Sequence, residues 1–100
     1  MAYEGDNESK RAFLIAQGAQ IRKLRKAAGY SCEYLSMALN PATPSRDRIS
    51  KVERGACGID EYDYLRLMWF LRAEAGPDHP AVQLARMLLP AEALLGGGAA

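Results

Sequence analysis

Apolar residues recur every three or four positions along most of the chain, a period typical of helices that pack by one face. The first such stretch begins near residues 6–9 and continues to Ala28, with Gly29 suited to end it. Gly18 lies within this stretch and should weaken the helix by about 1 kcal/mol relative to alanine. The pattern predicts an all-α protein.

A short amphipathic helix is expected after Ser31, whose hydroxyl suits an N-cap. Leu35, Ala38 and Leu39 recur on one face of it. The helix should end at Asn40, because the next residue is a proline, which lacks an N–H and restricts the residue before it. A turn is expected to follow.

A second short helix should begin within residues 43–45, with Pro44 in an early position, and should stop at Gly55. Ile49 and Val52 lie on one side of it. The remaining surface is polar and mostly basic, and the major groove of DNA admits a helix of this kind. Its outer face is therefore the candidate surface for contacting DNA bases.

A specific pattern of apolar, glycine and charged positions spans residues 21–71, and the segment ISKVERG at 49–55 is its most specific part. Its members are Ile21, Leu24, Arg25, Gly29, Ser31, Leu35, Leu39, Ile49, Ser50, Glu53 and Gly55. In these positions the chain resembles the helix-turn-helix domain of phage repressors of the Cro/C1 type, also called xenobiotic-response-element regulators. The resemblance implies a compact all-α bundle of about five helices.

The resemblance also implies which side chains contact DNA. Arg46, Asp47 and Lys51 would face base edges, and Ser45 or Arg48 would lie near phosphate. The candidate DNA-binding residues are Ser45, Arg46, Asp47, Arg48, Ser50 and Lys51.

An ion pair between Arg25 and Glu53 is a further implication of the resemblance. Removing one partner of a largely buried pair can cost roughly 3–5 kcal/mol, because the other charge is stranded. Cys32 stands where the family usually has a glutamine that contacts phosphate, and it replaces that donor poorly. The connection between Leu39 and Ile49 is longer than the compact turn of the family.

A longer helix is predicted over residues 60–76, with Asp60 as its N-cap. Its second half is apolar almost all round, which one small core cannot accommodate. A last helix should follow, capped by Asp78 or His79, with Pro80 in an early position and an end before Pro90. Residues after that proline are expected to form a flexible tail.

Either this last helix or a second subunit can cover the apolar run. We expect a homodimer through residues 60–95, since regulators of this type bind paired half-sites as symmetric dimers. The candidate dimer or core residues are Leu65, Met68, Trp69 and Leu88. The expected organisation is a helix-turn-helix DNA-binding domain at 1–75, with its motif at about 31–55, and a helical extension at 76–100.

The charge is unevenly distributed, although the net charge is only +1. Residues 10–54 carry +7, and the segments on either side carry −3 each. The basic part coincides with the predicted motif, as expected of a DNA-binding protein. Arg22, Lys23 and Lys26 could contact flanking phosphates, or they could simply be solvated.

The sequence gives little support to a membrane protein, a secreted protein or an enzyme. No apolar run is long enough for a membrane span, and the acidic start differs from a signal peptide, so a cytoplasmic protein is expected. Cys32 and Cys57 should be reduced, although a thiol at a helix N-terminus can have a lowered pKa. No catalytic constellation surrounds His79, and no metal or cofactor motif is present. We expect neither an enzyme nor a cofactor.

The leading hypothesis is therefore a sequence-specific transcriptional regulator, acting as a repressor, whose partner is double-stranded DNA. The alternative is a protein-binding module on the same scaffold, such as an antitoxin or a small anti-activator. The broad apolar surface of residues 65–71 and 81–95 supports that alternative. No ligand-sensing domain is expected in a chain of this length.

Overall fold

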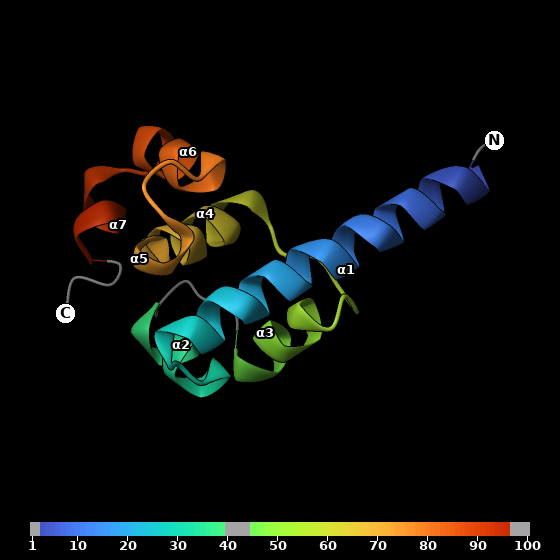
Figure 1. Cartoon of the computed structure of the whole chain (residues 1–100), viewed down its shortest axis with the longest axis horizontal. Helices are drawn as coiled ribbons and strands as arrows, with labels where there is room; N and C mark the ends of the chain where they lie inside the picture. Colours follow the sequence, from blue (N-terminus) through green and yellow to red (C-terminus); the bar gives the residue numbers. More distant parts are fainter. Residues whose placement is uncertain (1–2, 40–44, 97–100) are drawn as a thin grey trace.

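A computed structural model describes residues 3–39 and 45–96, and within these ranges it contains helices and no strands (Figure 1). The helices are α1 (Tyr3–Ala28), α2 (Cys32–Ala38), α3 (Arg46–Glu53), α4 (Glu61–Phe70), α5 (Arg72–Ala75), α6 (Pro80–Leu88) and α7 (Ala91–Gly96). The all-α prediction is confirmed, although the described residues form seven helical segments and not about five. None of these helices is long and apolar enough to cross a membrane.

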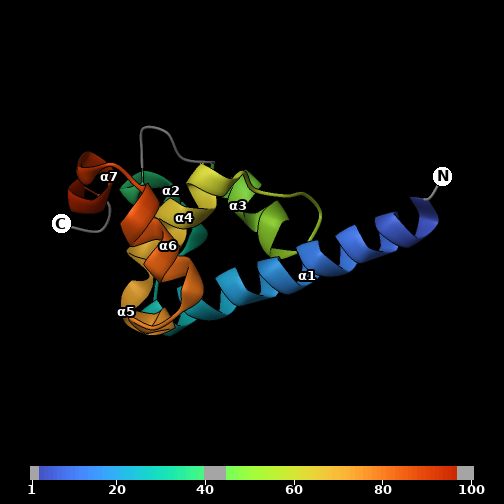
Figure 2. The same ribbon diagram turned by 90° about the horizontal axis from the view of Figure 1, so that it is seen from above.

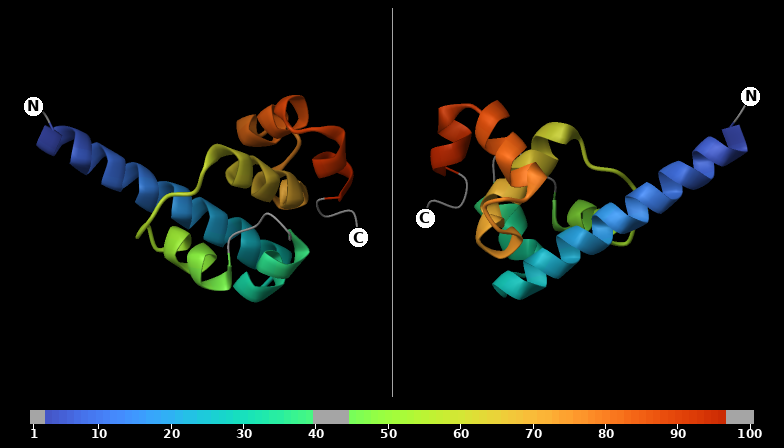
Figure 3. Two further views of the ribbon diagram at one scale, coloured as in Figure 1. Left: turned by 180° about the vertical axis from the view of Figure 1, so that it is seen from behind. Right: turned by 45° about the horizontal axis from the view of Figure 1, so that its top comes forward.

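Helix α1 begins at Tyr3, earlier than expected, and its first half projects beyond the other helices (Figure 2). Its second half contacts α3 and α5, and Figure 2 shows α2, α3, α4 and α6 together on one side of it. In Figures 1 and 3 this half of α1 passes across the boundary between α2–α3 and α4–α7. Phe13 and Ile15 are therefore 61% and 49% exposed, whereas Ile21 is fully buried. Only the second half of the predicted apolar stripe reaches the core.

The main core joins the first four helices. Its fully or nearly fully buried members are Ile21, Leu35, Leu39, Ile49, Val52, Leu67 and Leu71. These residues come from α1, α2, α3 and α4 and from the ends of α2 and α4. The main core therefore holds α2 and α3 together.

Helix α4 also contributes to a second, smaller core. Leu65 packs there with Ala85 of α6 and with Leu89. Because α4 lies between two cores, it can be apolar on most of its circumference. Helix α6 covers part of the apolar second half of α4, for which the sequence showed no certain partner. The single helix expected over residues 60–76 is interrupted at Leu71, which has φ −96° and ψ 18° and is fully buried.

Helix α6 begins where expected. His79 is its N-cap, since its Nδ1 accepts a hydrogen bond of 3.1 Å from the N–H of Ala81, and Pro80 is the first helical residue. Leu88, named as a core or dimer residue, is 58% exposed and so does not belong to the core of this chain.

The flexible tail expected after Pro90 is a wrong prediction for residues 91–96, which form α7. Trp69 donates a hydrogen bond of 2.9 Å from Nε1 to the carbonyl of Leu94, and Leu94 packs on the second core. This non-local contact holds a segment that has little helical signal of its own.

The two short helices of the motif differ from expectation at their facing ends. Helix α2 ends at Ala38 with Leu39 as its C-cap, so Asn40 does not end it. Ser45 is the N-cap of α3 and Arg46 its first residue. The early helical position expected for Pro44 falls on a residue that the structure does not describe. Residues 40–44 lie outside the described residues.

Candidate nucleic-acid interface

Each helix of the motif is started by a serine. The hydroxyl of Ser31 accepts a hydrogen bond from the N–H of Tyr34 at 3.0 Å, and the hydroxyl of Ser45 accepts one from the N–H of Arg48 at 3.3 Å. Both serines have extended backbones, as N-caps do. Local sequence therefore sets where α2 and α3 begin.

The position of α3 depends on its close approach to α1. A β-carbon at Gly18 would lie 2.1 Å from the carbonyl oxygen of Val52 and 2.7 Å from that of Glu53. No other residue type fits between these backbones without moving one of them. Helix propensity identifies Gly18 only as a weak point of α1, whereas in the structure this residue is the contact point of α1 with α3.

The expected ion pair between Arg25 and Glu53 is present and joins the same two helices. Arg25 Nε lies 2.6 Å from Glu53 Oε2, and its Nη2 donates to Oε1 at 2.9 Å. The Glu53 side chain is only 3% exposed, and Arg25 also donates to the carbonyl of Tyr30. The hydrogen bond with Glu53 raises the pKa of Arg25, so the guanidinium stays charged.

Cys32 lies beside this ion pair, with its thiol 3.9 Å from Glu53 Oε2. Burial, followed by the nearby carboxylate, raises the pKa of the Cys32 thiol. The lowered pKa considered for a thiol at a helix N-terminus is therefore a wrong expectation here. A neutral thiol in this place has no special reactivity.

Helix α3 presents a polar face on the side away from α1 and α2. Ile49, Val52 and Glu53 are buried, and a period of 3.6 residues places Asp47, Lys51 and Arg54 opposite them. Arg54 was not among the candidate site residues, although it follows Lys51 by three positions on the same face. That spacing was the signal for it.

The remaining candidates lie on the two flanks of this face. Arg46 pairs with Asp47 at 3.4 Å, both highly exposed, which contributes little stability. Arg48 Nη2 donates a hydrogen bond of 3.0 Å to the carbonyl of Gly58, so its guanidinium is tied to the loop after α3. Ser50 accepts from Arg54 Nη1 at 2.7 Å.

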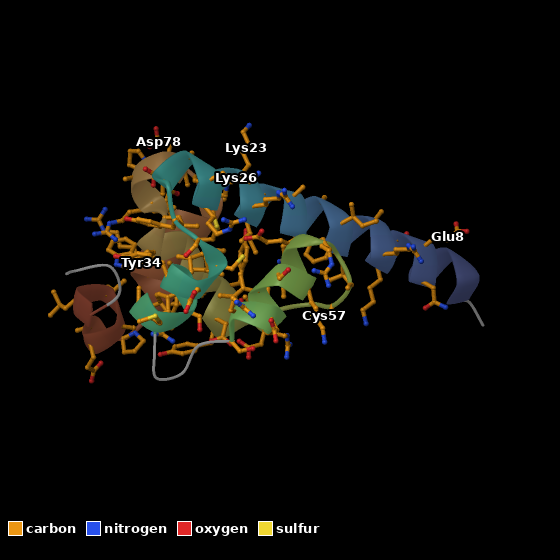
Figure 4. The ribbon with its side chains drawn as sticks, turned by 90° about the horizontal axis from the view of Figure 1, so that it is seen from below. Glu8, Lys23, Lys26, Tyr34, Cys57 and Asp78 are labelled. Atoms are coloured by element: carbon orange, nitrogen blue, oxygen red, sulfur yellow. The ribbon has the colours of Figure 1, made fainter. Side chains whose placement is uncertain are left out.

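Supporting contacts hold the end of α2 as well. The guanidinium of Arg66, on α4, donates to the carbonyl of Leu39, immediately before the long connection to α3. By contrast, Lys23 extends from α1 on the side opposite α3 (Figure 4). This direction favours the solvated reading of Lys23 over contact with phosphate beside α3.

The other candidate residues lie away from this face. Leu65 and Met68 are buried in α4, and Trp69 is half-buried against α7. In the part of the chain that the structure describes, no three His, Cys, Asp or Glu side chains are grouped to hold a metal ion.

Comparisons of the chain with protein-family models, with curated proteins and with solved structures found no match. The resemblance to Cro/C1-type domains therefore depends on the residues of the sequence and remains a prediction.

Proposed function

We propose that this protein is a sequence-specific DNA-binding transcriptional regulator that acts as a repressor in the cytoplasm. One observation carries the proposal. Helix α3 packs against α1 and α2, and the exposed residues of the helix and its C-cap are four basic side chains and one acidic one, namely Arg46, Arg48, Lys51, the C-cap Arg54, and Asp47. A short, well-anchored helix with a basic outer face suits the major groove.

In this mechanism α3 enters the major groove by its outer face. Lys51 and Arg46 would donate to guanine or phosphate, and each good base contact discriminates by about 1–3 kcal/mol. Phosphate contacts would fix the register, so affinity should fall steeply as salt rises. A homodimer would place two α3 helices on half-sites one helical turn apart, and occupancy of a promoter would block transcription.

The test is capture of fragmented source-genome DNA by purified protein at near-physiological salt, followed by sequencing. We expect a few enriched sites that share an inverted repeat, and we expect the Arg46→Ala/Lys51→Ala double variant to lose them. Diffuse or absent enrichment by the folded wild-type protein would contradict the proposal.

Two further variants separate direct contact from indirect effects. Arg86→Ala removes an exposed arginine from α6 and should retain DNA capture, which makes it a matched control for Arg46→Ala. Arg25→Ala should also lose capture, but through unfolding, because it strands Glu53. An unchanged melting midpoint for Arg25→Ala would refute that role of the ion pair.

A protein-binding module remains the second candidate. The observation that favours it is a set of exposed apolar side chains on α6 and α7, namely Leu84, Met87, Leu88 and Leu95. If changes at Leu88 abolish the regulatory activity of the protein while Arg46→Ala and Lys51→Ala leave that activity intact, the partner is a protein. The opposite pattern identifies DNA.

A further inference from the structure

A groove with a volume of about 590 Å³ lies beside α5 and α6, in a part of the molecule that the proposed DNA interface does not use. Its apolar wall consists of Trp69, Ala73, Pro77, Val82 and Met87. This volume is within the range of small-molecule sites, which are mostly apolar with a few polar groups that set orientation.

The polar lining of the groove is predominantly cationic. Arg72 and Arg86 both line it, and Asp78 is its one acidic residue (labelled in Figure 4). Neither arginine has an ion-pair partner among the residues that the structure describes. The lining thus carries a formal charge of +1, which favours an anion.

Arg72 is already positioned by the protein. Its guanidinium stacks over the indole of Trp69, 4.2 Å from the ring centroid, and its Nη1 donates to the carbonyl of Trp69 at 2.7 Å. The remaining N–H groups of this guanidinium are donors that a carboxylate can accept. An aromatic wall and a fixed cation therefore meet in one place.

We propose that the groove binds a small organic anion, with its carboxylate on Arg72 and Arg86 and its apolar body along Trp69, Val82 and Met87. Charge complementarity selects the anionic head group, and the apolar wall selects a hydrocarbon or aromatic body. The inference goes beyond the proposed DNA binding and does not depend on it.

Trp69 is the only tryptophan of the chain, so its fluorescence reports directly on the groove. The probes are decanoate, decanol and decylammonium. Each is titrated into the full-length protein, with decanoate and decylammonium kept below the concentration at which they form micelles and decanol kept below its solubility limit. We expect a saturable change with decanoate and binding at least tenfold weaker for the other two. Equal binding of all three, or no saturable change with decanoate, would overturn the proposal.

Three variants locate the binding. Arg86→Gln removes an exposed charge and should weaken decanoate binding about tenfold, since a charge-assisted hydrogen bond is lost. Ala73→Phe fills the groove from an exposed position and should weaken it as well. Lys10→Gln, on the projecting half of α1, is the charge-matched control and should bind decanoate normally. Unaltered binding by both groove variants, with unchanged melting curves, would show that the probe binds elsewhere.

Discussion

Gly18 is the residue at which α1 and α3 come closest. The β-carbon of an alanine would meet two backbone carbonyl oxygens, and neither belongs to a side chain that can rotate away. Helix propensity alone favours alanine by about 1 kcal/mol. The structure reverses this expectation, because the clash of a β-carbon with backbone destabilises the fold by more than the higher helix propensity of alanine stabilises it.

We predict that Gly18→Ala lowers the free energy of unfolding by about 3 kcal/mol. The measurement is chemical denaturation of the variant beside the wild type. Ala19→Gly, at the next, exposed position, is the control and should lose about 1 kcal/mol through propensity alone. A Gly18→Ala protein more stable than the wild type would show that the helices do not approach this closely.

Cys32 has an environment that opposes ionisation. Burial and the Glu53 carboxylate raise the pKa of its thiol, so the folded state holds this proton more tightly than the unfolded chain does. Cys32 therefore contributes stability that is present below about pH 8.5, the pKa of an unperturbed thiol, and is lost as the pH rises through the folded value.

The pH dependence of iodoacetamide alkylation, measured on a Cys57→Ser variant, gives the pKa of the Cys32 thiol. We predict a midpoint above about 8.5 in the folded protein and an ordinary value in denaturant. A midpoint below that of the denatured chain would restore the possibility of a redox-sensitive thiol.

At the scale of single elements, α7 depends on a contact with another helix. The hydrogen bond from Trp69 to the carbonyl of Leu94 and the packing of Leu94 on the second core attach α7 to the rest of the molecule. A helix of six residues has too few internal hydrogen bonds to persist alone. Its helical state is therefore decided by α4.

Truncation after Leu89 should expose Trp69 and shift its emission to longer wavelength, because the indole loses its hydrogen-bond partner and apolar cover. Truncation after Gly96 removes only residues 97–100 and should leave the emission unchanged. Identical spectra for both truncated proteins would mean that α7 does not cover Trp69 in solution.

At the scale of the whole molecule, apolar surface remains on α6 after both cores are filled. Leu84 and Leu88 are one helical turn apart, and they are 45% and 58% exposed. They belong to the segment through which we expect a symmetric dimer. Such a dimer would bury this stripe against its own copy.

We predict that Leu88→Glu converts a dimer to a monomer in analytical ultracentrifugation, with little change in helical content. Gln83→Glu introduces the same charge at an exposed polar position of α6 and should leave the association unchanged. A wild-type protein that is monomeric at all concentrations would contradict the predicted homodimer.

Features that depend on near neighbours follow from the sequence alone. Ser31 and Asp60 start their helices through hydrogen bonds to an N–H three residues on, and Gly55 ends the segment after α3 with a positive φ of 77°. The basic face of α3 also follows from spacing alone, because helical period and charge are both local properties.

Features that depend on distant parts of the chain require the packed structure. The projection of α1, the interruption at Leu71 and the helical state of α7 follow from where other helices lie, which periodicity does not reveal. Within the candidate site, the contact of Arg48 with Gly58 and the role of Gly18 were hidden for the same reason. Gly18 contacts residues far from it in the chain, and Arg48 contacts Gly58 across the loop that follows α3. Only the packed structure brings these groups together.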